Sequence, residues 1–406
     1  MRRIIFLALL SALLNHGFVS ASAPLVIYLE ADRTHHQASA ISIEQGFKTA
    51  FSEVNNTIQG YPVEFLVLDH RANASRSYKN MQSFAADPQA LAFVAGLHST
   101  PLLKYRDYIN KNQLLTLVPW AAGGPITRAS DDQNSIFRLS IDDTKVGGFL
   151  VDYALNTKQC QRPKLLLEHT PWGQSNAENM SNSLLEQGRP KPQISWFQWG
   201  INETDARITL RTIINEGADC VLLVANSAEG EVIVRAMSKL QRDKRLPIIS
   251  HWGITGGSFT DNVSITERES VDLSFVQSCF SFLAPQLNDF SKSVFTQASI
   301  LFDEINQEND IKAPVGFIHA YDLAKVFISA MNQVELVDDN KVNQLALIKA
   351  LENLNATTQG LIKNYQRPFR PYRVDDPDAH EALNQNDYCI AHFNNSGDTL
   401  VQSKEE

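Results

Sequence analysis

Apolar residues occur along this chain in two alternating patterns. Short continuous apolar runs, such as 91–95 and 220–224, are typical of strands that are buried on both faces of a sheet. Longer stretches, such as 38–54, repeat apolar residues three and four positions apart, which is typical of helices with one buried face. The alternation predicts parallel sheets with helices on both sides, and therefore an α/β fold.

The pattern divides the chain into two similar sets of elements. Strands are predicted at 25–29, 63–68, 91–95, 114–118, 136–139, 164–168, 194–198, 220–224, 247–250 and 388–393. Helices are predicted at 38–54, 75–86, 101–110, 146–155, 176–186, 206–216, 230–240, 287–305, 315–332 and 341–354. Because the pattern restarts near residues 140–143, we predict two doubly wound lobes.

The first 23 residues, MRRIIFLALLSALLNHGFVSASA, have the three parts of a secretory signal peptide. Two arginines precede an apolar stretch at 4–14, and small residues follow it. We predict cleavage after Ala21 or Ala23 and prefer Ala21, because the other cut leaves Pro24 at the start of the mature chain. A membrane anchor, the alternative, needs a longer apolar stretch. We therefore expect an exported protein with no membrane span after signal cleavage.

Composition and cysteine content narrow the class of protein. The chain has 406 residues, 43% of them hydrophobic, and a formal net charge of −9 without a basic run, so we expect no nucleic-acid partner. Its four cysteines permit disulfides in an exported chain. Cys160 and Cys220 each precede a predicted strand of the same region, so we expect them to pair, which leaves Cys279 with Cys389. Four free buried thiols remain the alternative.

The loops after the predicted strands are the expected binding positions, because ligands of parallel α/β sheets bind beyond the carboxyl ends of the strands. One such loop places His98, Ser99 and Thr100 before a helix that is expected to begin at Pro101. Ser99 or Thr100 is a candidate helix cap. We expect these hydroxyls and the helix N-terminus also to hold a carboxylate, and capping alone is the alternative.

Further candidate binding residues follow other strands. An aromatic ring and small side chains occur together at Trp120, Ala121 and Ala122. In the second set of elements, the strand ends carry the candidates Trp172, Asn226, Glu229, Trp252 and Thr255. Aromatic rings with a few polar groups are typical of small-molecule sites. For each tryptophan, core packing is the alternative interpretation.

Signatures of catalysis and metal binding are weak. The chain contains no G-x-S-x-G, no H-E-x-x-H and no phosphate-binding glycine motif. The pairs His35 with His36 and His169 with His251 offer acid–base or ligand groups, but none has metal-ligand spacing along the chain. We therefore expect no metal, no cofactor and no enzymatic activity.

Taken in order, these loops resemble those of the type I periplasmic solute-binding proteins, and the nearest branch is the leucine/isoleucine/valine-binding kind. The resemblance covers nearly the whole chain after the signal peptide. It rests on FVAGLHST at 93–100, TLVPWAA at 116–122, FRLS at 137–140, WG at 172–173 and AYDLA at 320–324. It implies a periplasmic protein that closes on a small polar solute, such as an amino acid, and delivers it to an ABC permease of the inner membrane.

The resemblance also implies the domain boundaries and the roles of particular residues. Two lobes joined by a hinge of three crossovers would comprise 24–140 with 283–355, and 141–282 with 356–406. In the family, hydroxyls and backbone N–H groups hold the ligand carboxylate, and an aromatic ring from the second lobe closes over the ligand. These roles carry over to the following positions: Ser99, Thr100 and Ala122 for the carboxylate, and Trp172 for the ring.

Two positions depart from the family pattern. The acidic partner of the ligand ammonium falls near Thr255, and Ala122 replaces a hydroxyl residue. Glu229, Glu30 or Asp32 would then supply the counter-charge, or the ligand lacks an ammonium. Two other functions remain as alternatives. One is a ligand sensor that acts on a membrane histidine kinase, and the other is a secreted amide hydrolase suggested by the adjacent histidine and serine in GLHST.

Overall fold

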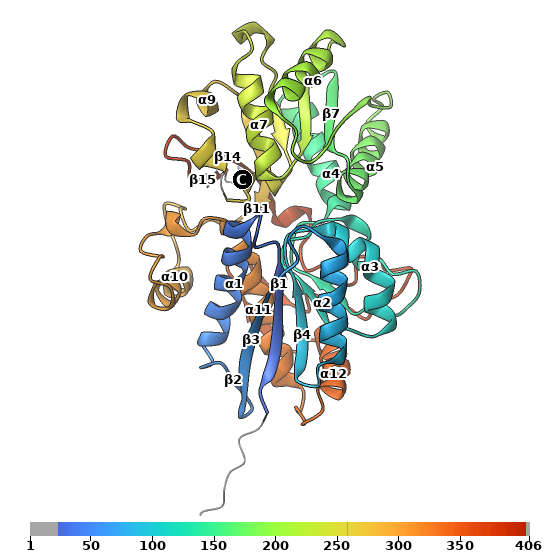
Figure 1. Ribbon diagram of the computed structural model, residues 1–406, viewed down its shortest axis with the longest axis vertical. Helices are drawn as coiled ribbons and strands as arrows, with labels where there is room; N and C mark the ends of the chain where they lie inside the picture. The colour runs from blue at the N-terminus through green and yellow to red at the C-terminus, as the bar shows by residue number, and fades with distance from the viewer. Residues whose placement is uncertain (1–22, 258, 403–406) are drawn as a thin grey trace, which may run out of the picture.

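The structure is a computed structural model that describes residues 23–257 and 259–402. The predicted signal peptide, up to residue 22, lies outside the described residues. The chain forms two α/β lobes stacked along the long axis of the molecule (Figure 1). The lower lobe in this view contains the N-terminal strands, and the upper lobe contains the middle of the chain.

The lower sheet has six strands in the order β2-β3-β1-β4-β5-β6. These are β1 (Leu25–Ala31), β2 (Thr57–Ile58), β3 (Tyr61–Asp69), β4 (Ala90–Ala95), β5 (Thr116–Val118) and β6 (Ile136–Arg138). Neighbouring strands are parallel except for β2, which pairs antiparallel to β3 at the sheet edge. The prediction of a parallel sheet is therefore confirmed for its centre and corrected at this edge.

The upper sheet has seven strands in the order β15-β14-β11-β10-β9-β7-β8. These are β7 (Pro163–Glu168), β8 (Ile194–Phe197), β9 (Cys220–Val224), β10 (Ile248–Ser250), β11 (Leu273–Ser278), β14 (Tyr388–Phe393) and β15 (Thr399–Val401). Five of them are parallel, whereas β14 and β15 add an antiparallel edge that comes from the C-terminal tail. A separate hairpin pairs β12 (Thr357–Gln359) with β13 (Asn364–Gln366).

Helices cover both faces of each sheet, as the sequence pattern predicts. Those of the lower lobe are α1 (Gln37–Ser52), α2 (Ala74–Ala86), α3 (Ser99–Lys111), α10 (Asp289–Leu301), α11 (Pro314–Gln333) and α12 (Asn340–Glu352). Those of the upper lobe are α4 (Asp143–Asp152), α5 (Pro171–Glu186), α6 (Glu203–Asn215), α7 (Ser227–Ser238), α8 (Phe259–Asn262) and α9 (Ile265–Glu269).

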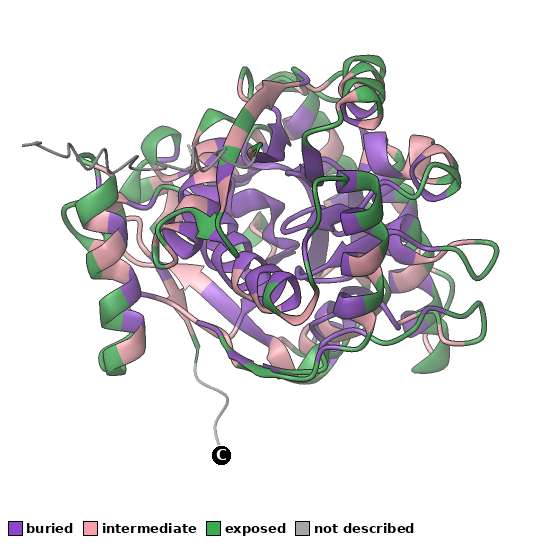
Figure 2. Ribbon diagram, turned by 90° about the horizontal axis from the view of Figure 1, so that it is seen from below, coloured by how far each residue is buried: buried purple, intermediate pink, exposed green. Residues whose placement is uncertain are grey.

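Alternate side chains of the central strands pack on opposite sides of the upper sheet. Leu165 and Leu167 of β7 belong to the buried cluster that includes α4 and α5, whereas Leu166 belongs to the cluster that includes α6 and α7. This follows from the two-residue period of a strand. Viewed from below, buried residues fill the strands and the inner faces of the helices, and exposed residues lie on the outside (Figure 2).

Three segments connect the lobes: 139–142 after β6, 279–288 after β11, and the segment that leads from α12 to β14. Before it reaches β14, the tail packs on the lower lobe. Leu361 and Ile362 donate backbone hydrogen bonds to Asp322 of α11, and Arg138 of β6 exchanges backbone hydrogen bonds with His380 and Ala382. These contacts differ from the expected assignment of all of 356–406 to the upper lobe, and the exact domain boundaries stay a prediction.

A buried group of charges holds two of these connections together. The guanidinium of Arg138, fully buried, donates to Glu381 at 2.8 and 2.6 Å and lies 3.0 Å from Asp142. Removing one partner would leave an uncompensated buried charge, which is strongly destabilising. This network fixes the tail to the start of the first crossover.

Two disulfides have the predicted pairing. One joins Cys160 to Cys220 and the other joins Cys279 to Cys389. The second links the end of β11 to its antiparallel neighbour β14. Within the described residues, none of the helices combines the length and the apolar character that crossing a bilayer requires.

Candidate functional site

The carboxyl ends of the parallel strands in the two sheets point toward each other across the junction of the lobes (Figure 1). A cavity of about 20 Å³ lies between them, which is room for about one water molecule. Both lobes contribute to its lining: Leu97, His98, Ser99, Thr100, Trp120 and Ala122 from below, and Glu168, Trp172, Trp199, Asn226, Trp252 and Gly253 from above. The aromatic side chains therefore fill most of the space between the lobes in this conformation.

Eight of the eleven predicted site residues line this cavity. Ala121 instead belongs to a hydrophobic cluster with residues of α3. The Glu229 carboxylate accepts a hydrogen bond from the Gly200 N–H at 3.1 Å, and the Thr255 hydroxyl donates to the Trp252 carbonyl at 2.8 Å. The structure thus brings most of the predicted residues together, and their role in binding stays a prediction.

The N-terminus of α3 lies at the cavity, but Ser99 does not cap it. The helix begins at Ser99 rather than at Pro101, and its N-cap residue, His98, makes no side-chain capping bond. The Ser99 hydroxyl accepts a hydrogen bond from the Gly123 N–H at 3.0 Å. The capping expectation is therefore wrong for Ser99, and its side chain joins the two loops that were predicted to hold a carboxylate.

Four tryptophans surround the cavity. The rings of Trp120 and Trp252 face each other across the lobes with centroids 5.6 Å apart, and both are almost fully buried. The indole N–H of Trp172 donates to Asp143 at 3.3 Å, and its ring lies 4.9 Å from that of His251. Packing and cavity lining are thus combined in the same side chains, and ligand contact by the tryptophans stays a prediction.

Trp199 was missed by the sequence analysis. It follows β8, is 43% exposed, and places its ring 5.6 Å from that of His98 in the opposite lobe. The rule that points to loops at carboxyl strand ends applies to β8 as well, so the signal was present in the sequence. Trp199 is the most exposed of the four tryptophans that line the cavity.

Glu168, the last residue of β7, also lines the cavity and was not predicted, and the same is true of Leu97 and Gly253. Burial raises the pKa of its carboxyl from 4.5 to about 7. The Asn226 amide donates to its Oε2 at 3.2 Å. Sequence analysis treated Glu168 as the end of a strand and expected the counter-charge elsewhere. Side-chain hydrogen bonds with Trp199, Thr170 and Asn226 act to lower this pKa, but burial and the nearby Glu229 outweigh them. A buried carboxyl whose pKa stays raised is suited to pair with a cationic group.

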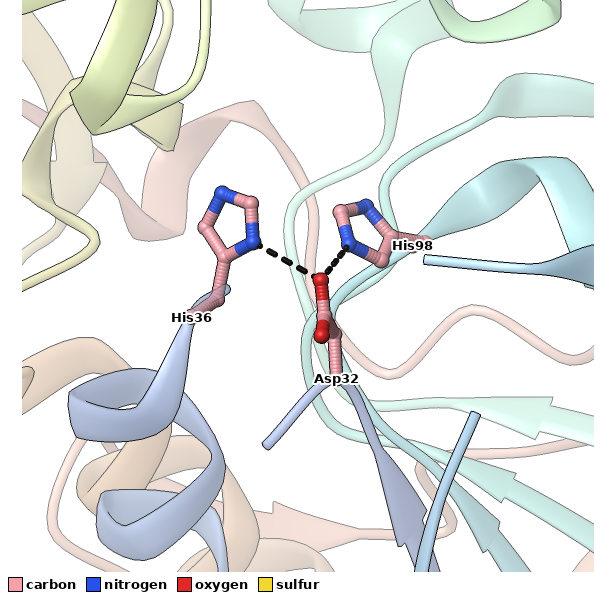
Figure 3. Close-up of side chains that lie close together, drawn as sticks. All are labelled: Asp32, His36 and His98. Atoms are coloured by element: carbon pink, nitrogen blue, oxygen red, sulfur yellow. Dashed lines mark hydrogen bonds and ion pairs between the residues drawn. The ribbon is translucent and has the colours of Figure 1, made fainter. Parts of the chain in front are cut away.

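Two histidine side chains, His36 and His98, lie against Asp32, immediately after β1. Nδ1 of His36 and Nε2 of His98 lie 3.1 and 3.2 Å from its Oδ2 (Figure 3). Burial acts to raise the pKa of Asp32, but hydrogen bonds with His36 and His98 outweigh it and hold the pKa well below its usual range. Burial lowers the pKa of His98 despite the nearby Asp32 carboxylate. No spacing along the chain marks this cluster, because β4, which precedes His98, becomes the neighbour of β1 only in the folded sheet.

The other histidine pairs do not form shared sites. His169 lies on the exposed side of the upper lobe, with Nδ1 2.8 Å from the Gln198 amide. His251 is buried, with Nε2 2.9 Å from Asp143. In the pair that suggested a hydrolase, Ser99 bonds to Gly123 while His98 bonds to Asp32.

The chain thus has two α/β lobes with a small cavity between them, lined by side chains from both. Residues 29–397 match the family described as "Periplasmic binding protein", and the chain belongs to that family. A comparison with curated proteins finds no match. The family resemblance predicted from the sequence is therefore confirmed.

Solved structures show the same fold. A type 1 periplasmic binding protein from Bordetella pertussis is 14% identical with a TM-score of 0.75, over 93% of this chain and 99% of that one. A leucine-binding protein from Thermotoga maritima is 16% identical with a TM-score of 0.73, over 93% and 98%. An ABC-transporter solute-binding protein from R. palustris, in complex with benzoate, is 14% identical with a TM-score of 0.73, over 93% and 95%. At these identities the likeness concerns the fold alone.

Proposed function

We propose that this chain is a periplasmic protein, exported by its signal peptide, that closes on a small polar solute and delivers it to an ABC permease of the inner membrane. The main support is the cavity between the carboxyl ends of the two sheets, lined by side chains from both lobes. Ligands of open α/β sheets bind at this edge. Two of the similar structures are described as leucine-binding and as an ABC-transporter solute-binding protein.

The solute enters when the lobes move apart about their three connections. The present cavity of about 20 Å³ is far smaller than the hundreds of cubic ångströms typical of ligand pockets. Direct hydrogen bonds also join the lobes: the Ser39 hydroxyl donates to the Gly256 carbonyl at 2.7 Å, and the Gly124 N–H donates to the Ser175 hydroxyl at 3.1 Å. Hinge opening of this kind is a common response of bilobed proteins, and the solute then shifts the population toward the closed form.

In the proposed complex, an acidic group of the solute faces the N-terminus of α3. This end carries partial positive charge and backbone N–H groups, and no side chain caps it. Thr100 and Ser99 add hydroxyl groups beside it, and both line the cavity. A solute carboxylate is the natural partner of such an arrangement.

The opposite side of the cavity favours a cationic group. Glu168 is buried there, with its pKa raised to about 7 by burial. An ammonium group that binds beside it stabilises the ionised carboxylate, so binding near pH 6 releases a proton. The affinity for an amino acid should therefore increase as the pH rises from 5.5 to 8. The affinity for a purely anionic solute, such as an aromatic carboxylate, should decrease over the same rise in pH.

Isothermal titration calorimetry tests the proposal. The protein is unfolded and refolded first, so that solute carried from the cell is removed, and the extract is analysed by mass spectrometry. The refolded chain is then titrated with amino acids, aromatic carboxylates and short fatty acids. We expect saturable binding of at least one class with a micromolar or lower Kd. If no solute binds and the extract contains none, the proposed function is wrong.

A further inference from the structure

The cluster around Asp32 lies beside the cavity, and the established family assignment gives it no role. Asp32 follows β1, His36 precedes α1, and His98 precedes α3, so three elements of the lower lobe position it. One carboxylate oxygen and one nitrogen from each ring all lie within 4.8 Å of one another. From this geometry we propose that Asp32, His36 and His98 bind a divalent transition-metal ion of the zinc type.

The interatomic distances fit such an ion. Zinc bonds to histidine nitrogen and carboxylate oxygen are about 2.0–2.1 Å long, which places two ligands of a tetrahedral site about 3.3 Å apart. The two nitrogens lie 3.1 and 3.2 Å from Oδ2 of Asp32 (Figure 3). Two edges of the coordination polyhedron are therefore already formed. The two nitrogens lie within 4.8 Å of each other.

The donor set and its burial agree with this assignment. Imidazole and carboxylate together suit zinc, nickel, copper and cobalt rather than calcium or magnesium. Asp32 is fully buried, His98 is 7% exposed, and the side chain of His36 is 11% exposed. A buried carboxylate shared by two imidazoles is a preorganised site, because its ligands need little rearrangement.

A second observation comes from nitrogen atoms that lack partners. Nε2 of His36 is buried and has no hydrogen-bond partner among the described residues, and neither ring nitrogen of the buried His70 has one. The His70 ring lies 5.5 Å from that of His98, and its Nε2 is 3.9 Å from Glu30. Most buried polar side-chain atoms in proteins have partners. Nε2 of His36 is the ring nitrogen that does not face Asp32, so Nδ1 is the atom of this ring that would bind the ion.

Three protein ligands leave one tetrahedral position for water or for an anionic group. His98 also lines the cavity between the lobes, so the ion would lie next to the proposed solute. His35 offers a further nitrogen, because its Nδ1 lies 3.2 Å from Oδ1 of Asp32 and its side chain is 56% exposed. The metal site thus goes beyond the proposed function and does not depend on it.

The test is a zinc titration of the full mature chain, made without a polyhistidine tag and freed of metal with a chelator. Calorimetry in the absence of solute should show one zinc ion per chain with a submicromolar Kd. His36→Gln should weaken binding at least tenfold, as should Asp32→Asn. His169→Gln is the matched control, because His169 lies outside the cluster in the other lobe, and it should leave the zinc affinity unchanged.

Cobalt(II) provides a readout that does not depend on the variants folding well. The wild-type chain with cobalt should show the strong visible absorption of a four-coordinate ion, and zinc should displace it. The melting temperature of each variant is measured without metal to confirm that it folds. No saturable zinc binding by the wild type, or equal affinity in wild type and His36→Gln, would overturn the metal site. A negative solute panel with positive zinc binding would reject the proposed function and leave the metal site intact.

Discussion

At the scale of single residues, the cavity combines side chains that stabilise the fold with side chains that are free to respond to a solute. Trp120 and Trp252 are almost fully buried, so their loss would affect the whole core. Trp172 also bonds to Asp143 and is only 8% exposed, so its removal should reduce stability as well as binding. Trp199 is different, because nearly half of it is exposed.

Trp199→Ala should weaken solute binding at least tenfold and change the melting temperature little, because the exposed ring contributes more to the cavity than to the core. Trp196→Ala is a close control: Trp196 lies three residues earlier, is 39% exposed, and does not line the cavity. Calorimetry and thermal unfolding of both variants check this. Equal affinities for the two variants would show that Trp199 does not contact the solute.

Glu168 should make the stability of the protein depend on pH. Because burial raises its pKa from 4.5 to about 7, the folded state holds a proton in this window that the unfolded chain has released. Wild-type stability therefore falls as the pH rises through this range. Glu168→Gln removes this effect, so the variant should be more stable than wild type at pH 8, by at most about 3 kcal/mol, and similar to it at pH 4.

Thermal unfolding at several pH values measures this difference. Glu178→Gln serves as the control, because Glu178 is exposed on α5, and its curve should follow that of the wild type. A Glu168→Gln variant that is no more stable than wild type at pH 8 would mean that the carboxyl is better compensated than its surroundings indicate.

The candidate site could be predicted from the sequence as far as the rule about strand ends reaches. That rule found His98 and Asn226 because each lies in a loop directly after a parallel strand. The rule also selected Ala121, which does not line the cavity, since neighbouring residues of one loop point to different sides. It selected Glu229 and not Glu168, whereas Glu168 is the carboxylate that lines the cavity. Which of two nearby carboxylates faces the cavity depends on loop geometry, and the hydrophobic pattern carries no information about that.

At the scale of elements, the central strands and helices follow from periodicity, whereas the edges do not. The sequence pattern predicts β14 as a strand but not its antiparallel direction, because the direction depends on how the tail returns. The hairpin of β12 and β13 was not predicted. It is held by Asp322, which accepts hydrogen bonds from Leu361, Ile362 and the Tyr365 hydroxyl. Asp322 lies in the AYDLA segment at 320–324, which was noted in the sequence, but the pattern did not show that this side chain holds the tail.

The disulfide between β11 and β14 should stabilise this edge of the upper sheet. The double variant Cys279→Ser with Cys389→Ser removes a link that closes a loop of sequence separation 110, which should lower the free energy of unfolding by about 2–4 kcal/mol. Solute affinity below the unfolding transition should stay the same, because neither cysteine lines the cavity. Chemical unfolding and thiol titration check this, and an unchanged midpoint would contradict it.

At the scale of the whole molecule, the contact between Ser39 and Gly256 offers a way to lock the lobes together. A Cβ atom on Gly256 would lie 3.4 Å from the Ser39 hydroxyl oxygen, and the φ of −70° at Gly256 suits any residue. Neighbouring atoms 3.2 Å from that Cβ would have to shift slightly. Cysteines at both positions are therefore close enough to form a disulfide between the lobes.

We expect Ser39→Cys with Gly256→Cys, after oxidation, to bind solute at least tenfold more slowly than wild type, and a mild reductant to restore the rate. Stopped-flow tryptophan fluorescence measures this, since four tryptophans line the cavity. The single variant Ser39→Cys and reductant-treated wild type are the controls. Normal binding by the fully oxidised double variant would show that a solute reaches the cavity without separation of the lobes.

The position of β14 also sets an order of events during synthesis. This strand comes from residues 388–393, yet it pairs with β11, more than a hundred residues earlier. The upper sheet therefore cannot be completed until residues 388–393 are available, although domains usually fold as units. Until β14 pairs with it, the edge of β11 stays open, and a chain cut off before β14 would present this edge to other chains and be prone to aggregate.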